Sequence, residues 1–149
     1  MRNSFINNLW LMTGLLVLSI CITSCMTAKK KNAQAQNKPL VETYWMLTHV
    51  KGEPIPKSVT PTIVFGTDGR YSGNLGCNEY YGTYQCRKDK IKMSYGAATK
   101  RLCEHIKIEK LFMQNLHSDF TRYEIKNETL YLMDANGEVL RFMAGVKQN

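Results

Sequence analysis

Short extended segments, each closed by turn-forming residues, recur along most of this 149-residue chain. In Glu42–Val50 the residues alternate, so that Trp45 and Leu47 share one face of a strand. Gly66–Gly69 and Asp134–Gly137 contain the residue types that hairpin turns need. Connections this short join antiparallel neighbours, because a parallel crossover needs a much longer connection. The chain is therefore restricted to a meandering antiparallel sheet.

A single segment changes from the strand period to a helical one. Between Glu104 and Phe120, large apolar residues recur three or four positions apart, which predicts one amphipathic helix packed on the sheet. The other segments predict eight strands, five before the helix and three after it: Glu42–Val50, Thr62–Phe65, Arg70–Leu75, Tyr80–Arg87 and Lys90–Tyr95, then Thr121–Ile125, Thr129–Met133 and Glu138–Met143. The predicted fold class is mostly β (α+β), with the sheet curled over one helix.

The length and charge of the chain limit its organisation and its partners. About 110 residues follow position 39, which is enough for one core and too few for two. The formal net charge is +8, but residues 39–149 hold 15 Lys and Arg against 12 Asp and Glu. The folded part is only mildly basic, so we expect no nucleic-acid partner.

The amino terminus has the features of a secretory signal. Arg2 precedes an apolar run, Leu9–Ile22, that is shorter than the roughly 20 residues of a membrane span. The run ends in Ile22-Thr23-Ser24-Cys25, which resembles the bacterial lipobox. This resemblance implies a signal peptide over 1–24, cleavage before Cys25, and a diacylglycerol and an N-acyl chain on Cys25. The alternative is an uncleaved signal anchor in which Cys25 is a thiol beside the membrane.

Residues 25–39 are predicted to form a lipidated, flexible tether. Met26 is the only large apolar side chain in Met26–Pro39, so no burial offsets the entropy of ordering this segment. Lys29–Lys31 would lie near the headgroups, where each basic residue contributes about 1 kcal/mol of attraction to an anionic surface. Met26 is neither an Asp nor the start of an acidic run. We therefore expect a lipid-anchored protein of the bacterial cell envelope, at the outer membrane and facing the periplasm.

A family resemblance covers residues 40 to 144. Gly73–Tyr84 looks like the GCN-aromatic-x-G-x-Y signature of the META/HslJ domain family. Other landmarks follow in the family order: Trp45–Leu47, Pro61–Phe65, Thr99–Cys103, Leu130–Leu132 and Leu140–Phe142. One departure is Thr99–Cys103, where Thr-Lys-Arg-Leu-Cys replaces the usual T-[RM]-M-A-C. The resemblance implies a META/HslJ-like domain over 40–146, folded as an antiparallel, partly open β-barrel of about eight strands packed by one α-helix.

The resemblance also implies which residues define the site. The family signature falls on eight positions with structural roles: Trp45, Gly76, Cys77, Asn78, Gly82, Tyr84, Thr99 and Cys103. Cys77 and Cys103 match family positions and are the implied disulfide pair, which leaves Cys86 over; the open alternative is three reduced, buried thiols. Asn78 is expected to tolerate a left-handed backbone and to bond within its own turn.

These residues favour a binding or accessory protein over an enzyme. The family is loosely linked to heat stress, drug tolerance or motility, and the resemblance implies no catalytic reaction. Cys103, Glu104 and His105 could suggest a metal if the fold brings Cys77 near, but a zinc site needs three or four convergent ligands, and His49 and His117 have no ligand spacing. We therefore expect no metal, and no cofactor beyond the lipid on Cys25. The expected partners are the membrane and an unidentified envelope protein or small apolar ligand.

Two other functions stay open from the sequence. A half-barrel covered by a helix could carry a small apolar or lipid-like ligand in a pocket lined by Trp45, Phe65, Leu116 and Phe142. A thiol-dependent enzyme could use Cys103, which precedes the helix, although the chain has no C-x-x-C pair. Five tyrosines could line a groove or cover the sheet: Tyr71, Tyr80, Tyr81, Tyr84 and Tyr95.

Overall fold

The computed structural model describes residues 37–147. In this range the elements are β1 (Tyr44–Val50), β2 (Glu53–Pro54), β3 (Thr62–Phe65), β4 (Arg70–Asn74), β5 (Glu79–Arg87), β6 (Lys90–Ala98), α2 (Ile106–Leu116), β7 (Arg122–Lys126), β8 (Thr129–Asp134) and β9 (Gly137–Gly145). In the same range no helix is long and apolar enough to cross a membrane. The predictions for the signal peptide (1–24), the lipid on Cys25 and the tether lysines 29–31 lie outside the described residues.

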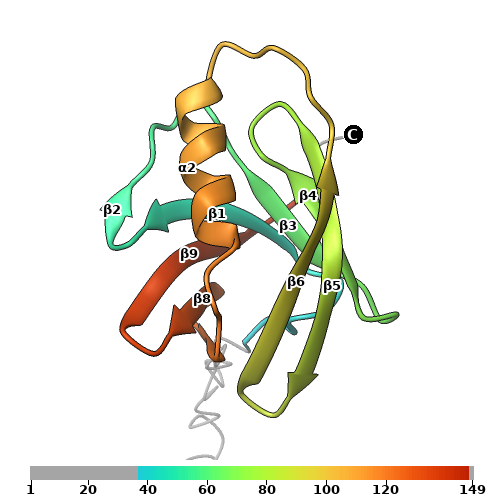
Figure 1. Ribbon diagram of the computed structural model, residues 1–149. Helices are drawn as coiled ribbons and strands as arrows, with labels where there is room; N and C mark the ends of the chain where they lie inside the picture. Colours follow the sequence, from blue (N-terminus) through green and yellow to red (C-terminus); the bar gives the residue numbers. More distant parts are fainter. Residues whose placement is uncertain (1–36, 148–149) are drawn as a thin grey trace, which may run out of the picture. The chain divides into compact units, whose positions relative to one another are not determined.

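The predicted fold class is confirmed, since the described residues form one antiparallel sheet and one helix. The strand order is β2-β1-β3-β4-β5-β6-β7-β8-β9, and β1 also pairs with β9, so the sheet curls into a ring (Figure 1). The β1–β9 ladder is long and runs from Tyr44↔Gly145 to Val50↔Leu140. The β6–β7 ladder is a weak seam with a single residue pair, Lys90↔Arg122. The ring is therefore firmly joined at β1–β9 and partly open at β6–β7.

The structure has one strand that was not predicted, a shorter helix, and longer ends on β6 and β9. Glu53–Pro54 forms β2, an additional strand that pairs with the end of β1 through a turn at Gly52, whose φ is +83°. The helix spans Ile106–Leu116, which is shorter than the predicted Glu104–Phe120. Phe120 lies in the loop after α2, and its side chain is buried in the core. A buried apolar residue at this spacing looks like part of the helix in the sequence, although it is not helical.

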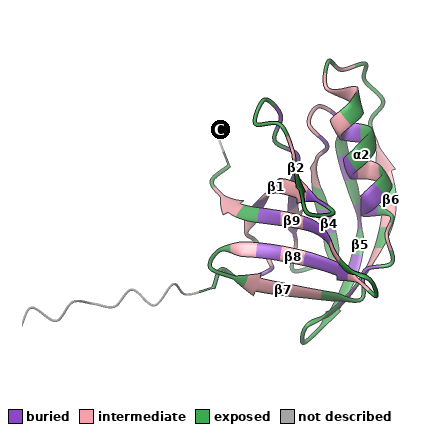
Figure 2. Cartoon of the chain, turned by 90° about the vertical axis from the view of Figure 1, so that its left-hand side faces the viewer, coloured by how far each residue is buried: buried purple, intermediate pink, exposed green. Residues whose placement is uncertain are grey.

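Aromatic side chains from the ring and from α2 meet in the core. Phe112 of α2 contacts Tyr80 of β5 and Phe142 of β9, with ring centroids 5.7 and 6.0 Å away and the rings edge to face. This arrangement is preferred because the positive edge of one ring meets the negative face of the other. Figure 2 shows buried positions on α2 and on the strands β5, β8 and β9. The helix is thus held against the sheet by its buried face.

Candidate functional site

The signature begins in the turn between β4 and β5. Leu75 N donates to Asn78 O at 2.7 Å, and Gly76 N donates to Asn74 Oδ1 at 2.7 Å. Gly76 has φ +118°, and a Cβ at this position would lie 2.5 Å from Val59 Cγ2. Glycine is required here because any side chain would meet both an unfavourable backbone conformation and a neighbour. The turn therefore holds its last two residues, Cys77 and Asn78, in a fixed orientation.

Asn78 is the centre of the site. It is 2% exposed, and its side chain makes four hydrogen bonds to oxygen and nitrogen atoms. Oδ1 accepts from Thr99 Oγ1 at 2.8 Å and from Arg101 N at 2.7 Å. Nδ2 donates to Arg101 O at 3.0 Å and to Glu109 Oε1 at 2.7 Å. The prediction of a left-handed backbone is wrong, because Asn78 has no positive φ and its side chain bonds to the Thr99–Glu109 region and not to its own turn.

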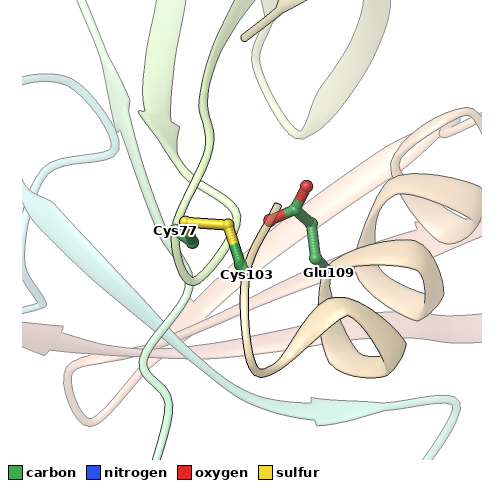
Figure 3. A group of neighbouring side chains, drawn as sticks. All are labelled: Cys77, Cys103 and Glu109. Carbon is green, nitrogen blue, oxygen red and sulfur yellow. A yellow bond between two sulfur atoms is a disulfide. The ribbon is translucent and has the colours of Figure 1, made fainter. Parts of the chain in front are cut away.

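Cys77 and Cys103 are joined by a disulfide that links the β4–β5 turn to the segment before α2 (Figure 3). They are the two cysteines that the family resemblance paired, and they lie 26 positions apart. Cys86, near the end of β5, is a free and exposed cysteine. The structure thus has the bridged form and not the alternative of three reduced, buried thiols.

Glu109, in the first turn of α2, lies beside the disulfide (Figure 3). It is 6% exposed, and one carboxylate oxygen and the two sulfurs lie within 4.8 Å of one another. Asn78 N donates to Glu109 Oε2 at 3.3 Å, in addition to the bond from Nδ2 to Oε1. Within residues 37–147, no basic side chain forms an ion pair with this carboxylate. Asn78 and the amino-terminal end of the helix are the groups that stabilise its charge.

The sequence reasoning missed Glu109, although a signal was present. Glu109, Phe112 and Leu116 fall at positions i, i+3 and i+7, so they share the buried face of α2. A charged side chain on that face needs a polar partner in the interior. Asn78 is this partner, and it lies 31 positions earlier in the chain.

The segment Thr99–Cys103 is fixed by hydrogen bonds at its start. Thr99 N donates to Glu79 O at 3.0 Å, and Glu79 N donates to Thr99 Oγ1 at 3.1 Å. Where the family pattern has Met-Ala, Arg101 contributes its backbone N and O to Asn78, and the side chain of Leu102 is fully exposed. This chain therefore holds the segment through polar contacts and the disulfide.

The remaining signature residues support the core. Trp45 is fully buried, and its Nε1 donates to Leu40 O at 3.0 Å. The hydroxyl of Tyr84 donates to Gly66 O at 2.7 Å. Gly82 lies at an irregularity in the β5–β6 ladder, and a Cβ there would overlap the hydroxyl of Tyr71. Position 45 therefore needs a large ring, position 84 needs a hydroxyl, and position 82 has no room for a side chain.

Three of the five tyrosines are core residues whose hydroxyls bond to backbone carbonyls, and one of them is Tyr84, described above. Tyr80 donates to Thr62 O at 2.9 Å, and Tyr71 donates to Ser94 O at 3.3 Å. Burial raises the pKa of Tyr71 to about 12, and it also raises the pKa of Tyr80. Tyr81 is 59% exposed. Two roles were left open for the tyrosines, and Tyr71, Tyr80 and Tyr84 have the structural one, because they pack in the core of the sheet.

Two surface hollows lie apart from the disulfide. The first, of about 680 Å³, is bounded by Gln85–Arg87, Lys90–Met93 and Asp119–Thr121, next to the β6–β7 seam. The second, of about 670 Å³, lies over β3, β4 and β5 and includes Tyr81 and Lys147. Cys77 and Cys103, together with Asn78 and its hydrogen-bond partner Glu109, line neither hollow.

The pocket required by the carrier hypothesis is occupied by packed side chains. Trp45, Phe65, Leu116 and Phe142 are at most 2% exposed and belong to one core cluster. They line neither of the two hollows. A ligand among these four residues would have to displace the core.

Comparisons with known proteins agree with this architecture. A model of the META domain family matches residues 38–147. A protein from Burkholderia xenovorans with an NMR structure is 24% identical, with a TM-score of 0.56 over 72% of this chain and 85% of that chain. A crystal structure of a DUF4847 family protein from Bacteroides vulgatus is 15% identical, with a TM-score of 0.54 over 74% of this chain and 96% of that chain. A search of the curated proteins finds no match. The two structures share the fold, and the family model spans most of the sequence, so the chain belongs to the META domain family.

Proposed function

We propose that this META domain protein is a lipid-anchored lipoprotein of the cell envelope, and that its domain is a non-catalytic binding or stress-accessory module. The observation that carries the proposal is the bonding of three signature side chains to one another and to Glu109. Cys77, Asn78, Cys103 and Glu109 are in mutual contact and line neither hollow. A catalytic group must reach a substrate, whereas these groups hold the β4–β5 turn to α2. The signature therefore supports a rigid scaffold that presents its surface to a partner.

One further feature supports a location outside the cytoplasm, and another fits an anchor that holds the domain near the membrane. Disulfides such as Cys77–Cys103 persist in oxidising compartments, including the bacterial periplasm. The first described residues lie against the β7–β8 turn, because Asn127 N donates to Asn37 Oδ1 at 3.2 Å. Residues 26–36 can extend over at most about 40 Å between the lipidated cysteine and this point. An anchor on Cys25 would therefore keep the domain close to the bilayer.

The anchor is tested by mass spectrometry of the protein purified from its native envelope. We expect an amino-terminal peptide that begins at Cys25 and carries the diacylglycerol and acyl chains, and we expect Cys25→Ala to accumulate as the uncleaved precursor. Cys86→Ala is the matched control and should stay lipidated. A native chain that begins at Met1, or a soluble chain with an unmodified Cys25, would refute the proposal.

A second candidate function is carriage of an anionic amphiphile, and the first hollow favours it. Its floor includes the buried side chains of Ile91 and Phe120, and its rim has the exposed cations of Arg87, Lys90 and Lys92. An apolar floor below a cationic rim suits a ligand with an acyl chain and a carboxylate or phosphate head. The position differs from the core pocket expected from the sequence, because this hollow lies at the open seam of the ring.

Binding of a fluorescent fatty acid to the full chain in detergent-free vesicles tests the second candidate. The double substitution Lys90→Glu and Lys92→Glu should weaken binding about tenfold or more, and added salt should weaken binding to the unsubstituted protein. Lys57→Glu and Lys107→Glu, at exposed positions away from this hollow, are the matched control. Equal affinities for the two double variants would remove this candidate.

A further inference from the structure

We propose that Cys77 and Cys103 in their reduced form, together with Glu109, bind a divalent soft metal ion such as Zn²⁺ at the place where the structure has the disulfide. The three ligand atoms come from separate parts of the fold, namely the β4–β5 turn, the loop before α2 and the first turn of α2 (Figure 3). One oxygen and two sulfurs already lie within 4.8 Å of one another. The ligands of one zinc ion lie about 3–4 Å apart, so a small adjustment brings the three into coordination.

The backbone positions of the two cysteines fit this use. Their Cα atoms are 6.2 Å apart. Reduction lets the two sulfurs separate by rotation of the side chains, while the Cα atoms keep their places. Thiolate is the ligand that zinc prefers, and a carboxylate oxygen is an accepted third ligand. The fourth tetrahedral position would be left to a water molecule.

The charge at this place also favours a cation. Glu109 is 6% exposed and has no ion-pair partner in the part of the chain that the structure describes. Buried charges in proteins are normally paired or coordinate a metal. Two thiolates beside the carboxylate would make three negative charges, and a divalent ion would compensate two of them.

Asn78 provides the surrounding hydrogen bonds that metal ligands require. It donates to both oxygens of Glu109, from Nδ2 at 2.7 Å and from N at 3.3 Å. Its Nδ2 also lies 3.6 Å from Cys103 Sγ. Such outer hydrogen bonds orient the ligands of metal sites. The residue that fixes the oxidised site would therefore also fix the metal-bound one.

A dithiol reductant converts the disulfide form of the site into the dithiol form that binds the metal. The dithiol gives two electrons and two protons to the Cys77–Cys103 disulfide and becomes a disulfide itself, which leaves two thiols on the protein. Zn²⁺ then replaces both S–H protons, and these are released to water. A sulfur pair cannot be bonded to itself and to the ion at once, so the protein holds the metal only under reducing conditions. The sequence prediction of no metal considered Cys103, Glu104 and His105, with Cys77 nearby, but did not consider Glu109.

The test uses the full chain in detergent with Cys21→Ser, Cys25→Ser and Cys86→Ser, so that Cys77 and Cys103 are its only cysteines and lipidation plays no part. After reduction with a phosphine, titration with Co²⁺ should give a thiolate-to-metal charge-transfer band. Titration with Zn²⁺ should show one ion per chain and the release of about two protons. The oxidised sample should show no such band. A reduced, folded sample without the band would overturn the proposal.

Glu109→Gln in the same background tests the third ligand. It should weaken the affinity for Zn²⁺ about 10- to 100-fold or more. Glu104→Gln, at an exposed position beside Cys103, is the matched control and should leave the affinity unchanged. Equal affinities for these two variants would overturn the role of Glu109. If Glu109→Gln does not fold, the site is tested in the reduced chain with Glu109 intact, by alkylation of the cysteines mapped by mass spectrometry. Protection of both cysteines by Zn²⁺ would support the site, and alkylation of both in the presence of Zn²⁺ would refute it.

Discussion

Replacement of Asn78 by alanine should destabilise the domain far more than the loss of a small side chain. The change removes four hydrogen bonds, three to neutral groups of Thr99 and Arg101 and one to the buried Glu109 carboxylate, which loses its side-chain donor. A neutral bond contributes about 1 kcal/mol net, and a bond to a charged group about 1.5–3 kcal/mol. The unfolding free energy should therefore fall by about 4.5–6 kcal/mol, a large part of the whole stability of an ordinary domain.

The assay is urea unfolding of the purified full chain, followed by near-ultraviolet circular dichroism. Asn136→Ala, in an exposed turn, is the matched control and should change the unfolding free energy by less than about 0.5 kcal/mol. Asn78→Asp keeps the shape but places a second carboxyl next to Glu109. Its unfolding free energy should also fall, because a carboxyl group lacks the two N–H donors of the amide and two adjacent carboxylates repel each other. A loss below about 1 kcal/mol for Asn78→Ala would refute the reasoning, since a side chain satisfied by four bonds cannot be so dispensable.

Three further predictions concern the same domain. Cys77→Ser removes a bridge between residues 26 positions apart and should lower the unfolding free energy by about 3.5 kcal/mol in denaturant, whereas Cys86→Ser should have almost no effect; equal stabilities of the two variants would contradict this. Gly73→Ala places a Cβ against the backbone oxygen of Thr62 and should cost at least about 2 kcal/mol by thermal unfolding, with exposed Ser72→Ala as the neutral control. Tyr71 has a pKa raised from 10.0 to about 12, so its contribution to stability is complete below pH 10 and is lost as the pH rises toward 12; Tyr71→Phe should flatten this part of the stability curve, and an unchanged curve would show that another group titrates.

The hairpins were predictable because their turns are determined by neighbouring residues. Asp134 Oδ1 accepts from Asn136 N at 2.7 Å and from Gly137 N at 3.1 Å. Asp68 Oδ1 accepts from Arg70 N at 3.0 Å. These bonds lie within three positions along the chain, so the sequence pattern contains all the partners. The positions of the strands on either side follow from them.

The centre of the site was less predictable because its partners are distant in sequence. Asn78 was identified as structural, but its bonds to Arg101 and Glu109 span 23 and 31 positions. No local pattern at Asn78 states which residue will lie beside it. The strand β2 was missed for a different reason: it is only two residues long, and Pro54 has no N–H to give a strand pattern.

The pairing of β1 with β9 has a consequence for how the protein is made. Trp45 and Leu47 lie opposite Ala144 and Phe142, so β1 obtains this neighbour only after β9 has been synthesised. Contacts of such long sequence separation form slowly. Until β9 is available, the edge of β1 that it covers stays unpaired, and an unpaired strand edge can pair with another chain.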